Sequence, residues 1–397
     1  TDRITSYHLV RGLCRSPIML GLFRTVSPSI RLYKPKVLID SGSSRLQYRL
    51  TFIFLMGCCL FITATQFVGD PIRCLSDING DLEPQKKKTI ETYCWVSSTF
   101  TLPEALDGDM IERSPYLLKD IGPDLPGQRK YHSYYQWVPF ALFCQALLFY
   151  LPHYLWKAWE GHKMKSILMN LHLRLLPCGE RDREIEDLAN YLQRNLNYNQ
   201  FWLLKYLFCE LLGFTVAIGN IYITDAFLNN EFTSLGFSIF KQIDEDFETR
   251  RDILVKIFPR MTKCIWHSYG PSGTVQTNDV YCLLAWNNIN EKVYVFLWFW
   301  FMFVATCTSF RLLYLLVTFT FSVVREKIFI LSDHRHFDMD MFKLVMKRLY
   351  YADWLLLDQI QSNLTPDIFA CLVNKMGEKL IEEKKLFDET PKKKVIR

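Results

Sequence analysis

The apolar residues of this chain are gathered into long runs that alternate with long polar stretches. Four of these runs are long enough to cross a bilayer as helices, and they cover residues 50–68, 134–156, 202–223 and 293–321. The first run, LTFIFLMGCCLFITATQFV, has 19 residues and no charge. At a helical rise of about 1.5 Å per residue it reaches ~28 Å, close to the thickness of a hydrocarbon core. The pattern therefore predicts an all-α membrane protein with four transmembrane helices.

The basic residues near these runs predict which side of the membrane each connection faces. Nine Lys and Arg precede the first run against two Asp, which favours a cytoplasmic amino terminus. Four spans then return the carboxyl terminus to the same side. Acidic residues exceed basic ones only in the first and third connections, so we expect these two loops outside the cell. No cleavable signal precedes the first run, which is expected to serve as its own insertion signal.

The predicted organisation follows from the runs and the charges together. Its parts are a cytoplasmic amino-terminal segment (1–49), the first span (50–68), an extracellular loop (69–133, hereafter loop 1), the second span (134–156), a cytoplasmic loop (157–201), the third span (202–223), a second extracellular loop (224–292, hereafter loop 2), the fourth span (293–321) and a cytoplasmic carboxyl-terminal region (322–397).

An aromatic cluster, YHSYYQWVPF at residues 131–140, stands at the entrance to the second run. Tyr and Trp are favoured at a membrane surface, where the ring is buried in acyl chains and the polar tip stays hydrated. We interpret the cluster as a membrane-interface belt. Pro139 is expected in the first turn of the helix, where the missing N–H does no harm.

Composition agrees with a membrane protein that has substantial loops. Half of the 397 residues are hydrophobic and 15% are aromatic, yet the mean hydropathy is only +0.03. The net charge of +6 is mild, and basic residues do not interleave with aromatic ones, so a nucleic-acid partner is not expected. The motifs GxxxxGK[ST], HExxH and GxSxG are missing. We therefore predict neither an enzyme nor a catalytic, cofactor or metal site.

Four of the twelve cysteines lie in the two predicted extracellular loops, namely Cys74, Cys94, Cys264 and Cys282. An even number of cysteines on the oxidising side predicts two disulfides. Four cysteines allow three pairings, and the spacing alone does not select one. A zinc site is the alternative, but neither loop has the short spacing of a metal knuckle.

Three charged residues, Lys205, Glu210 and Arg311, lie within the apolar runs. Glu210 is in the middle of the third span, where a lone acid costs on the order of 3 kcal/mol, so it should face the helix bundle. We expect an inter-helix hydrogen-bonding role, with ion selectivity as the alternative. Lys205 and Arg311 lie nearer the cytoplasmic ends of the third and fourth spans and are expected to extend their charges to the membrane surface.

The carboxyl-terminal region carries two helical patterns. Thr365 and Pro366 resemble a helix start, and apolar residues recur at three-to-four spacing over residues 368–381. A similar apolar stripe extends over residues 342–356. Together with the middle loop, these helices are expected to form a cytoplasmic dome.

Several motifs resemble the innexin family of invertebrate gap-junction channels. They occur in the family's order: QFVGDPIRC at 66–74, TYCWVSSTFTLP at 92–103, YYQWVPF at 134–140, FPRMTKC at 258–264, YGPSG at 269–273 and NEKVYVFLWFWF at 290–301. The signature residues are Tyr134, Tyr135, Gln136, Trp137 and Val138. The resemblance extends from Arg45 to the end of the fourth span and more weakly into the tail. Within the family, KYHSYYQWVPF is most similar to the insect innexin 3 group.

The resemblance implies a function and an assembly. It pairs Cys74 with Cys282 and Cys94 with Cys264, so that the two extracellular loops are tied together. It implies a plasma-membrane channel in gap junctions, built with other innexin subunits in a ring that is expected to be octameric. The first span and the amino-terminal segment would line the pore, although this chain's amino-terminal segment is unlike the family's usual short one. The extracellular loops would dock onto a hemichannel of the neighbouring cell, so that ions and small molecules pass between cells. The alternative from another class is a four-span adhesion or scaffold protein that does not conduct.

Overall fold

The computed structural model describes most of the chain. The described residues are 37–75, 84–102, 129–168, 171, 178–242, 253–332 and 338–389. They form two compact units. Of the described residues, the spanning unit holds those between 40 and 161 and between 200 and 327, and the helical unit holds 37–39, those between 162 and 199 and those between 328 and 389. The amino-terminal residues 1–36, which were expected to help line the pore, lie outside the described residues.

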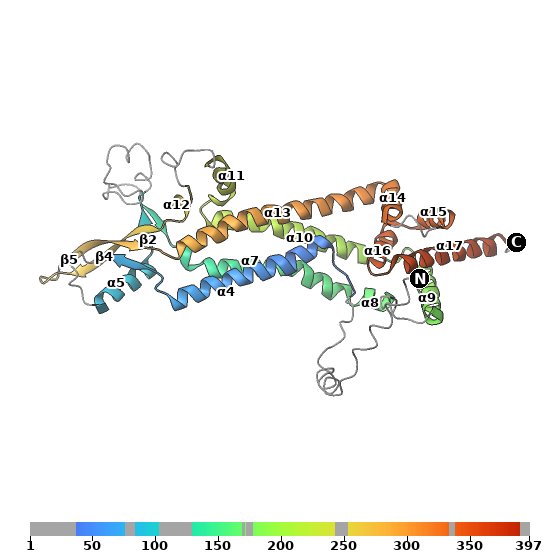
Figure 1. Ribbon diagram of the computed structural model, residues 1–397, viewed down its shortest axis with the longest axis horizontal. Helices are drawn as coiled ribbons and strands as arrows, with labels where there is room; N and C mark the ends of the chain where they lie inside the picture. Colours follow the sequence, from blue (N-terminus) through green and yellow to red (C-terminus); the bar gives the residue numbers. More distant parts are fainter. Residues whose placement is uncertain are drawn as a thin grey trace, which may run out of the picture. The chain divides into compact units, whose positions relative to one another are not determined.

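Four helices of the spanning unit are long and apolar enough to cross a membrane, which confirms the four-span prediction. They are the helical stretch that begins at Gly42, α7 (Val138–Glu160), α10 (Gln200–Phe227) and α13 (Asn287–Thr320) (Figure 1). The first consists of α3 (Gly42–Arg45), a π-helix η1 (Leu46–Thr51) and α4 (Phe52–Val68).

Three of these helices begin well away from the edge of their apolar run, and the first of them begins at Gly42, eight residues before Leu50. The second starts at Val138 because the signature residues Tyr134–Gln136 form a separate 3₁₀ turn, η3, and Pro139 lies in the first helical turn. The fourth starts six residues before the run, at Asn287. Its first turns carry Asn290 and Glu291, which are buried although they are polar. A hydropathy pattern does not recognise such residues as part of a span.

Loops 1 and 2 build one antiparallel sheet. Its strands are β1 (Arg73–Leu75), β2 (Thr99–Thr101), β3 (Lys130–His132), β4 (Met261–Tyr269) and β5 (Val275–Leu283). They are ordered β1-β5-β4-β2-β3, so strands of loop 1 lie on both sides of the β4–β5 hairpin of loop 2. Helix α5 (Pro84–Ser97) of loop 1 contacts β1 and β4. Neither loop therefore completes the sheet without the other.

The described residues of loop 2 also include two helices that precede its hairpin. Helix α11 (Phe232–Gln242) follows the third span after a short turn, and the short helix α12 (Ile253–Ile257) leads into β4. Most buried apolar side chains of the loops share one hydrophobic core with the spanning helices, and Phe100 and Leu102 of loop 1 form a small separate cluster.

The helical unit confirms the expected helical carboxyl-terminal region. It contains α8 (Lys163–Leu168), α9 (Cys178–Arg194), α15 (Met339–Arg348), α16 (Tyr351–Gln361), α17 (Pro366–Glu389) and the end of α14 (Ser322–Ser332). Phe329 is fully buried at its centre, where its ring contacts the rings of Phe342, Trp354 and Phe369.

The spacing of the apolar stripe suggested a single helix over residues 342–356, but the structure has two helices there. Leu349 and Tyr350 have extended backbone angles and separate α15 from α16. The break gives the two helices independent directions, so Val345 and Trp354 are both buried although they belong to different helices. Helix α17 does begin at Pro366, as the Thr-Pro pair indicated.

Candidate functional site

Two disulfides join loop 1 to loop 2. Cys74 in β1 lies directly opposite Cys282 in β5, and their sulfurs are 2.07 Å apart. Cys94 in α5 is bonded to Cys264 in β4, with 5.8 Å between the Cα atoms. The side chains of all four are at most 1% exposed. Each bond connects residues that are 208 or 170 positions apart, and both bonds connect one loop to the other.

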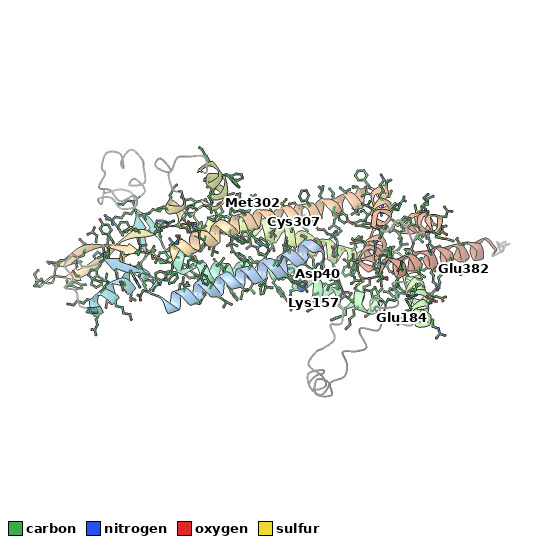
Figure 2. The ribbon with its side chains drawn as sticks, in the orientation of Figure 1. Asp40, Lys157, Glu184, Met302, Cys307 and Glu382 are labelled. Carbon is green, nitrogen blue, oxygen red and sulfur yellow. A yellow bond between two sulfur atoms is a disulfide. The ribbon has the colours of Figure 1, made fainter. Side chains whose placement is uncertain are left out.

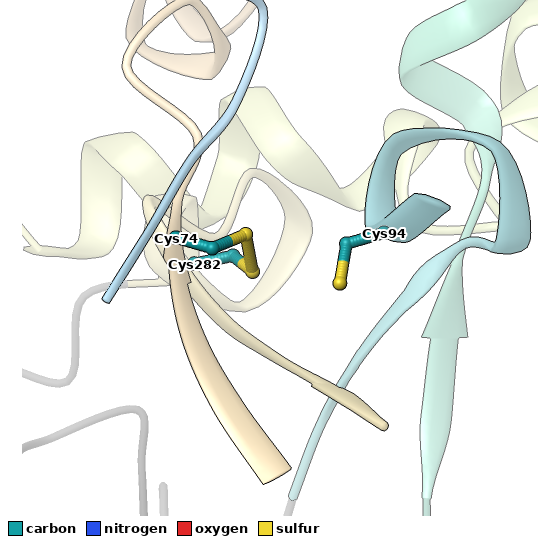
Figure 3. A group of neighbouring side chains, drawn as sticks. All are labelled: Cys74, Cys94 and Cys282. Atoms are coloured by element: carbon teal, nitrogen blue, oxygen red, sulfur yellow. A yellow bond between two sulfur atoms is a disulfide. The ribbon is translucent and has the colours of Figure 1, made fainter. Parts of the chain in front are cut away.

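The two disulfides are also close to each other. The sulfurs of Cys74, Cys94 and Cys282 lie within 4.8 Å of one another (Figure 3). A zinc ion would require thiolates, and a sulfur that is bonded to another sulfur carries none. With both bonds formed, this group of sulfurs is therefore a covalent crosslink between the loops rather than a metal site.

A buried hydrogen-bonded network connects the family signature to the start of the fourth span. The hydroxyl of Tyr134 donates to Asn287 Oδ1 at 2.8 Å. Asn287 Nδ2 in turn donates to the carbonyl of Pro259 in loop 2, also at 2.8 Å. Asn290 Nδ2 adds a second donor to Asn287 Oδ1 at 3.3 Å. The network fixes the entrance of the second span against both the fourth span and loop 2.

The next two signature residues attach the second span to loop 1. Gln136 Nε2 donates a hydrogen bond to the carbonyl of Trp95, in the last turn of α5. Carbonyls in the last turn of a helix have no partner within the helix, which explains why a polar residue is needed here. The rings of Trp95 and Tyr135 lie 4.6 Å apart, and Gln66 Nε2 donates to the carbonyl of Tyr135 at 3.2 Å.

The aromatic cluster is not a uniform interface belt, because only one of its signature residues, Trp137, is exposed. Tyr134, Tyr135 and Val138 are buried in the protein core. Trp137 is 59% exposed, and its ring lies beside that of Phe140, which is 64% exposed. A buried aromatic cluster and an interface belt have the same composition, so the sequence pattern does not separate them.

The Lys130–Glu231 ion pair adds to the connection between the loops and others lie within loop 2, and the sequence pattern did not identify them. Glu231 of loop 2 accepts from Lys130 of loop 1 at 3.1 Å, and Lys256 lies 3.3 Å from the same carboxylate. Glu291, whose side chain is fully buried, pairs with Arg260 at 3.1 Å and with Lys292 at 2.6 Å. A buried carboxylate needs such partners. The available signal for these ion pairs was the position of Glu291, which directly follows Asn290 at the edge of an apolar run.

His132 in β3 is an uncharged member of the sheet. Its side chain is buried, and one ring nitrogen is 2.7 Å from the hydroxyl of Thr101 in β2. Burial, together with the positive charge of Lys130, lowers the pKa of His132 to about 4. The imidazole is therefore neutral at physiological pH.

Glu210 in the third span contacts the fourth span through a polar cluster. Its carboxylate accepts from the hydroxyl of Tyr206 at 2.6 Å, and that hydroxyl accepts from Arg311 at 2.8 Å. Arg311 Nε is 3.8 Å from Glu210 Oε1. The expectation that Arg311 extends to the membrane surface is therefore wrong, because the side chain turns toward the third span. This geometry supports the inter-helix role of Glu210 over a role in ion selectivity.

Comparisons with known proteins agree with this architecture. The Innexin family model matches residues 40–380. Among similar proteins, Innexin inx2 of Drosophila melanogaster is 35% identical over 91% of this chain and 96% of its own length. Innexin inx2 of Schistocerca americana is 36% identical over 91% and 98%, and Innexin inx3 of Drosophila melanogaster is 36% identical over 90% and 89%. The resemblance found in the sequence motifs is confirmed: this chain belongs to the innexin family.

Proposed function

We propose that this chain is a gap-junction channel subunit whose channels pass ions and small molecules between adjacent cells. Its family and its four apolar helices make it a plasma-membrane channel protein that assembles with other innexin subunits. In the proposal, loops 1 and 2 face the extracellular space and both termini are cytoplasmic. The subunits form a ring, expected to be octameric, and the ring docks onto a ring of the neighbouring cell.

The observation that carries the proposal is the construction of the two loops. They share one sheet, two disulfides and the Lys130–Glu231 ion pair, although they are far apart in the sequence. Association of rigid surfaces costs less conformational entropy than association of mobile ones. A surface that must match a copy from another cell benefits from this rigidity.

The disulfides also support the orientation of the chain. Disulfides persist outside the cell and are rare in the reducing cytoplasm. All four bonded cysteines lie in loops 1 and 2. This agrees with the basic amino-terminal segment, which favours the cytoplasmic side.

Paired cells that express this chain alone provide the functional test. Junctional current between them is the expected result, together with uptake of a small impermeant dye by single cells under conditions that open hemichannels. A four-span adhesion or scaffold protein would reach the surface and give neither signal. Surface biotinylation therefore accompanies both measurements, and normal delivery without current or uptake would contradict the proposal.

Epitope tags test the orientation separately. Tags placed after Lys165 and at the carboxyl terminus should be inaccessible to antibody in intact cells. A tag at Gly108 in loop 1, a position outside the described residues, should be accessible. Surface labelling of the carboxyl-terminal tag without permeabilisation would exclude the proposed topology.

A further inference from the structure

Helix α11 leaves the end of the third span through a tight turn. Asn229 and Asn230 have positive φ angles of 56° and 62°, and Asn230 N donates to the carbonyl of Asp225 at 2.7 Å. The carboxylate of Asp225 accepts from Thr233 N at 2.7 Å, in the first turn of α11. An acidic acceptor at this position stabilises the start of a helix. The place where α11 begins is therefore determined by the end of α10.

The inner face of α11 rests on the fourth span at Trp298. Trp298 Nε1 donates to the carbonyl of Thr233 at 3.3 Å. A Cβ atom at Gly236 would come within 2.4 Å of the Trp298 ring, so only glycine permits this contact. Phe232 and Leu235, on the same face, are at most 1% exposed.

The contacts show that α11 crosses α13 rather than running along it. The ring of Phe237 is 5.5 Å from that of Trp298, and the ring of Phe240 is 5.7 Å from that of Phe299. Thr233, Phe237 and Phe240 extend about 10 Å along α11, at ~1.5 Å per residue, yet each of them contacts Trp298 or its neighbour Phe299. Phe232, at the start of α11, lies between Tyr294 and Phe301 on either side of this point. Figure 1 shows α11 beside the first half of α13.

The outer face of α11 is aromatic and continuous with the exposed apolar face of the fourth span. Phe237 is 65% exposed and Phe240 is 55% exposed. Phe240 contacts Phe299 of α13, which is itself exposed, and the same stretch of α13 carries the exposed residues Phe296, Met302 and Phe303, of which Met302 is labelled in Figure 2. These residues of α13 belong to a helix that crosses the membrane. Because the exposed rings of α11 adjoin a membrane-spanning surface, they contact the same environment as that surface, which is lipid.

The depth of the contact also favours lipid. Phe299 follows Val293, the first residue of the apolar run, by six residues, or ~9 Å along the helix. Amphipathic helices at a membrane surface bury their apolar face by about 5–10 Å. Helix α11 contains no acidic residue, and its exposed cation, Lys241, directly follows Phe240, where a long side chain can reach the headgroups.

We propose that α11 lies in the plane of the membrane surface, with Phe237 and Phe240 inserted among the acyl chains of the outer leaflet. In this arrangement the α11 part of loop 2 is bound to the membrane, whereas its β4–β5 hairpin is extracellular. The inference depends on the fourth span lying in a bilayer and is independent of conduction.

Photocrosslinking tests this assignment in the full-length protein. The photoreactive phenylalanine analogue p-benzoylphenylalanine replaces Phe237 or Phe240 in separate variants, reconstituted in phosphatidylcholine vesicles. The matched control carries it at Tyr269, which is 81% exposed at the end of β4. The analogue is aromatic and apolar, so exposed Phe positions accept it without loss of the fold. Irradiation followed by mass spectrometry of α11 peptides should show phospholipid adducts at both positions, at least five times the yield at Tyr269.

Three results would overturn the proposal. Crosslinked subunit dimers in place of lipid adducts would show that a second copy of the chain covers α11. Lipid yields equal to that at Tyr269 would place α11 in water. Lipid adducts at only one of the two positions would show that α11 does not present both rings to the leaflet.

Discussion

The three neighbouring sulfurs predict that the two cysteines of one disulfide are not equivalent. Replacing Cys264 by Ser frees the thiol of Cys94, whose sulfur lies within 4.8 Å of both sulfurs of the Cys74–Cys282 bond. The Cys94 thiolate can attack either sulfur, form a new bond with it and release the other as a thiolate. Replacing Cys94 by Ser instead frees Cys264, which is not a member of this group.

The cost of losing the Cys94–Cys264 bond follows from the loop that it closes. With Cys74–Cys282 intact, that loop is not the full 170-residue separation. It consists of the residues from Cys74 to Cys94 and from Cys264 to Cys282, about 38 in total. In the chain-entropy model a loop of this size corresponds to ~4 kcal/mol. Exchange lets the Cys264→Ser variant keep one crosslink, but the bond of Cys94 to Cys74 now lies within loop 1 and no longer joins the loops.

Mapping of unreduced peptides after alkylation of free thiols measures the outcome. Cys264→Ser should give a mixture that includes Cys94 bonded to Cys74 or to Cys282. Cys94→Ser should retain Cys74 bonded to Cys282 alone and leave Cys264 alkylated. An unchanged Cys74–Cys282 bond and a fully alkylated Cys94 in the Cys264→Ser variant would refute the reasoning.

Three further predictions concern polar groups in the spanning unit. The folded pKa of His132, about 4, is below its ordinary value of 6.5, so as the pH falls the unfolded chain binds a proton before the folded chain does. The free energy of unfolding should therefore fall between pH 6.5 and 4, by on the order of 3 kcal/mol. Thermal unfolding across this range should show a drop in the unfolding temperature that a His132→Gln variant lacks. Tyr134→Phe removes one of the two donors to the buried Asn287 Oδ1. Because Asn290 still donates, the loss should be that of one hydrogen bond, about 0.5–1.5 kcal/mol in chemical unfolding, and an unchanged midpoint would argue against the network. Arg311→Met leaves Glu210 without its cation and should cost about 3–5 kcal/mol, whereas Arg311→Met combined with Glu210→Gln should recover most of the loss; equal losses in both variants would show that the pair is not coupled.

The sequence predicted the parts of the fold that depend on long apolar runs. Four spans follow from hydropathy because a bilayer crossing requires about twenty apolar residues. The helix start at Asn287 was missed because the polar residues of its first turns are buried by contacts with residues 28 to 153 positions away, namely Pro259, Arg260 and Tyr134. Strands β1, β2 and β3 have three residues each, too few for an alternating pattern.

The candidate site depended more on the family resemblance and on tertiary contacts. Cysteine spacing allowed three pairings, and only the resemblance selected one. The reason for a polar Gln136 is the carbonyl of Trp95, which lies 41 positions away. Arg311 was expected at the membrane surface because its partners, Tyr206 and Glu210, are on another helix. Contacts between distant segments leave no periodic signal in a single sequence.

Junctional current between paired cells that express Cys74→Ser tests most directly whether the connected loops make the cell-to-cell channel. The account predicts that this variant reaches the surface, as measured by biotinylation, and passes no junctional current. Because Cys74 and Cys282 are bonded to each other, replacing Cys282 as well should cost little more. Full coupling of surface-delivered Cys74→Ser subunits would contradict the claim.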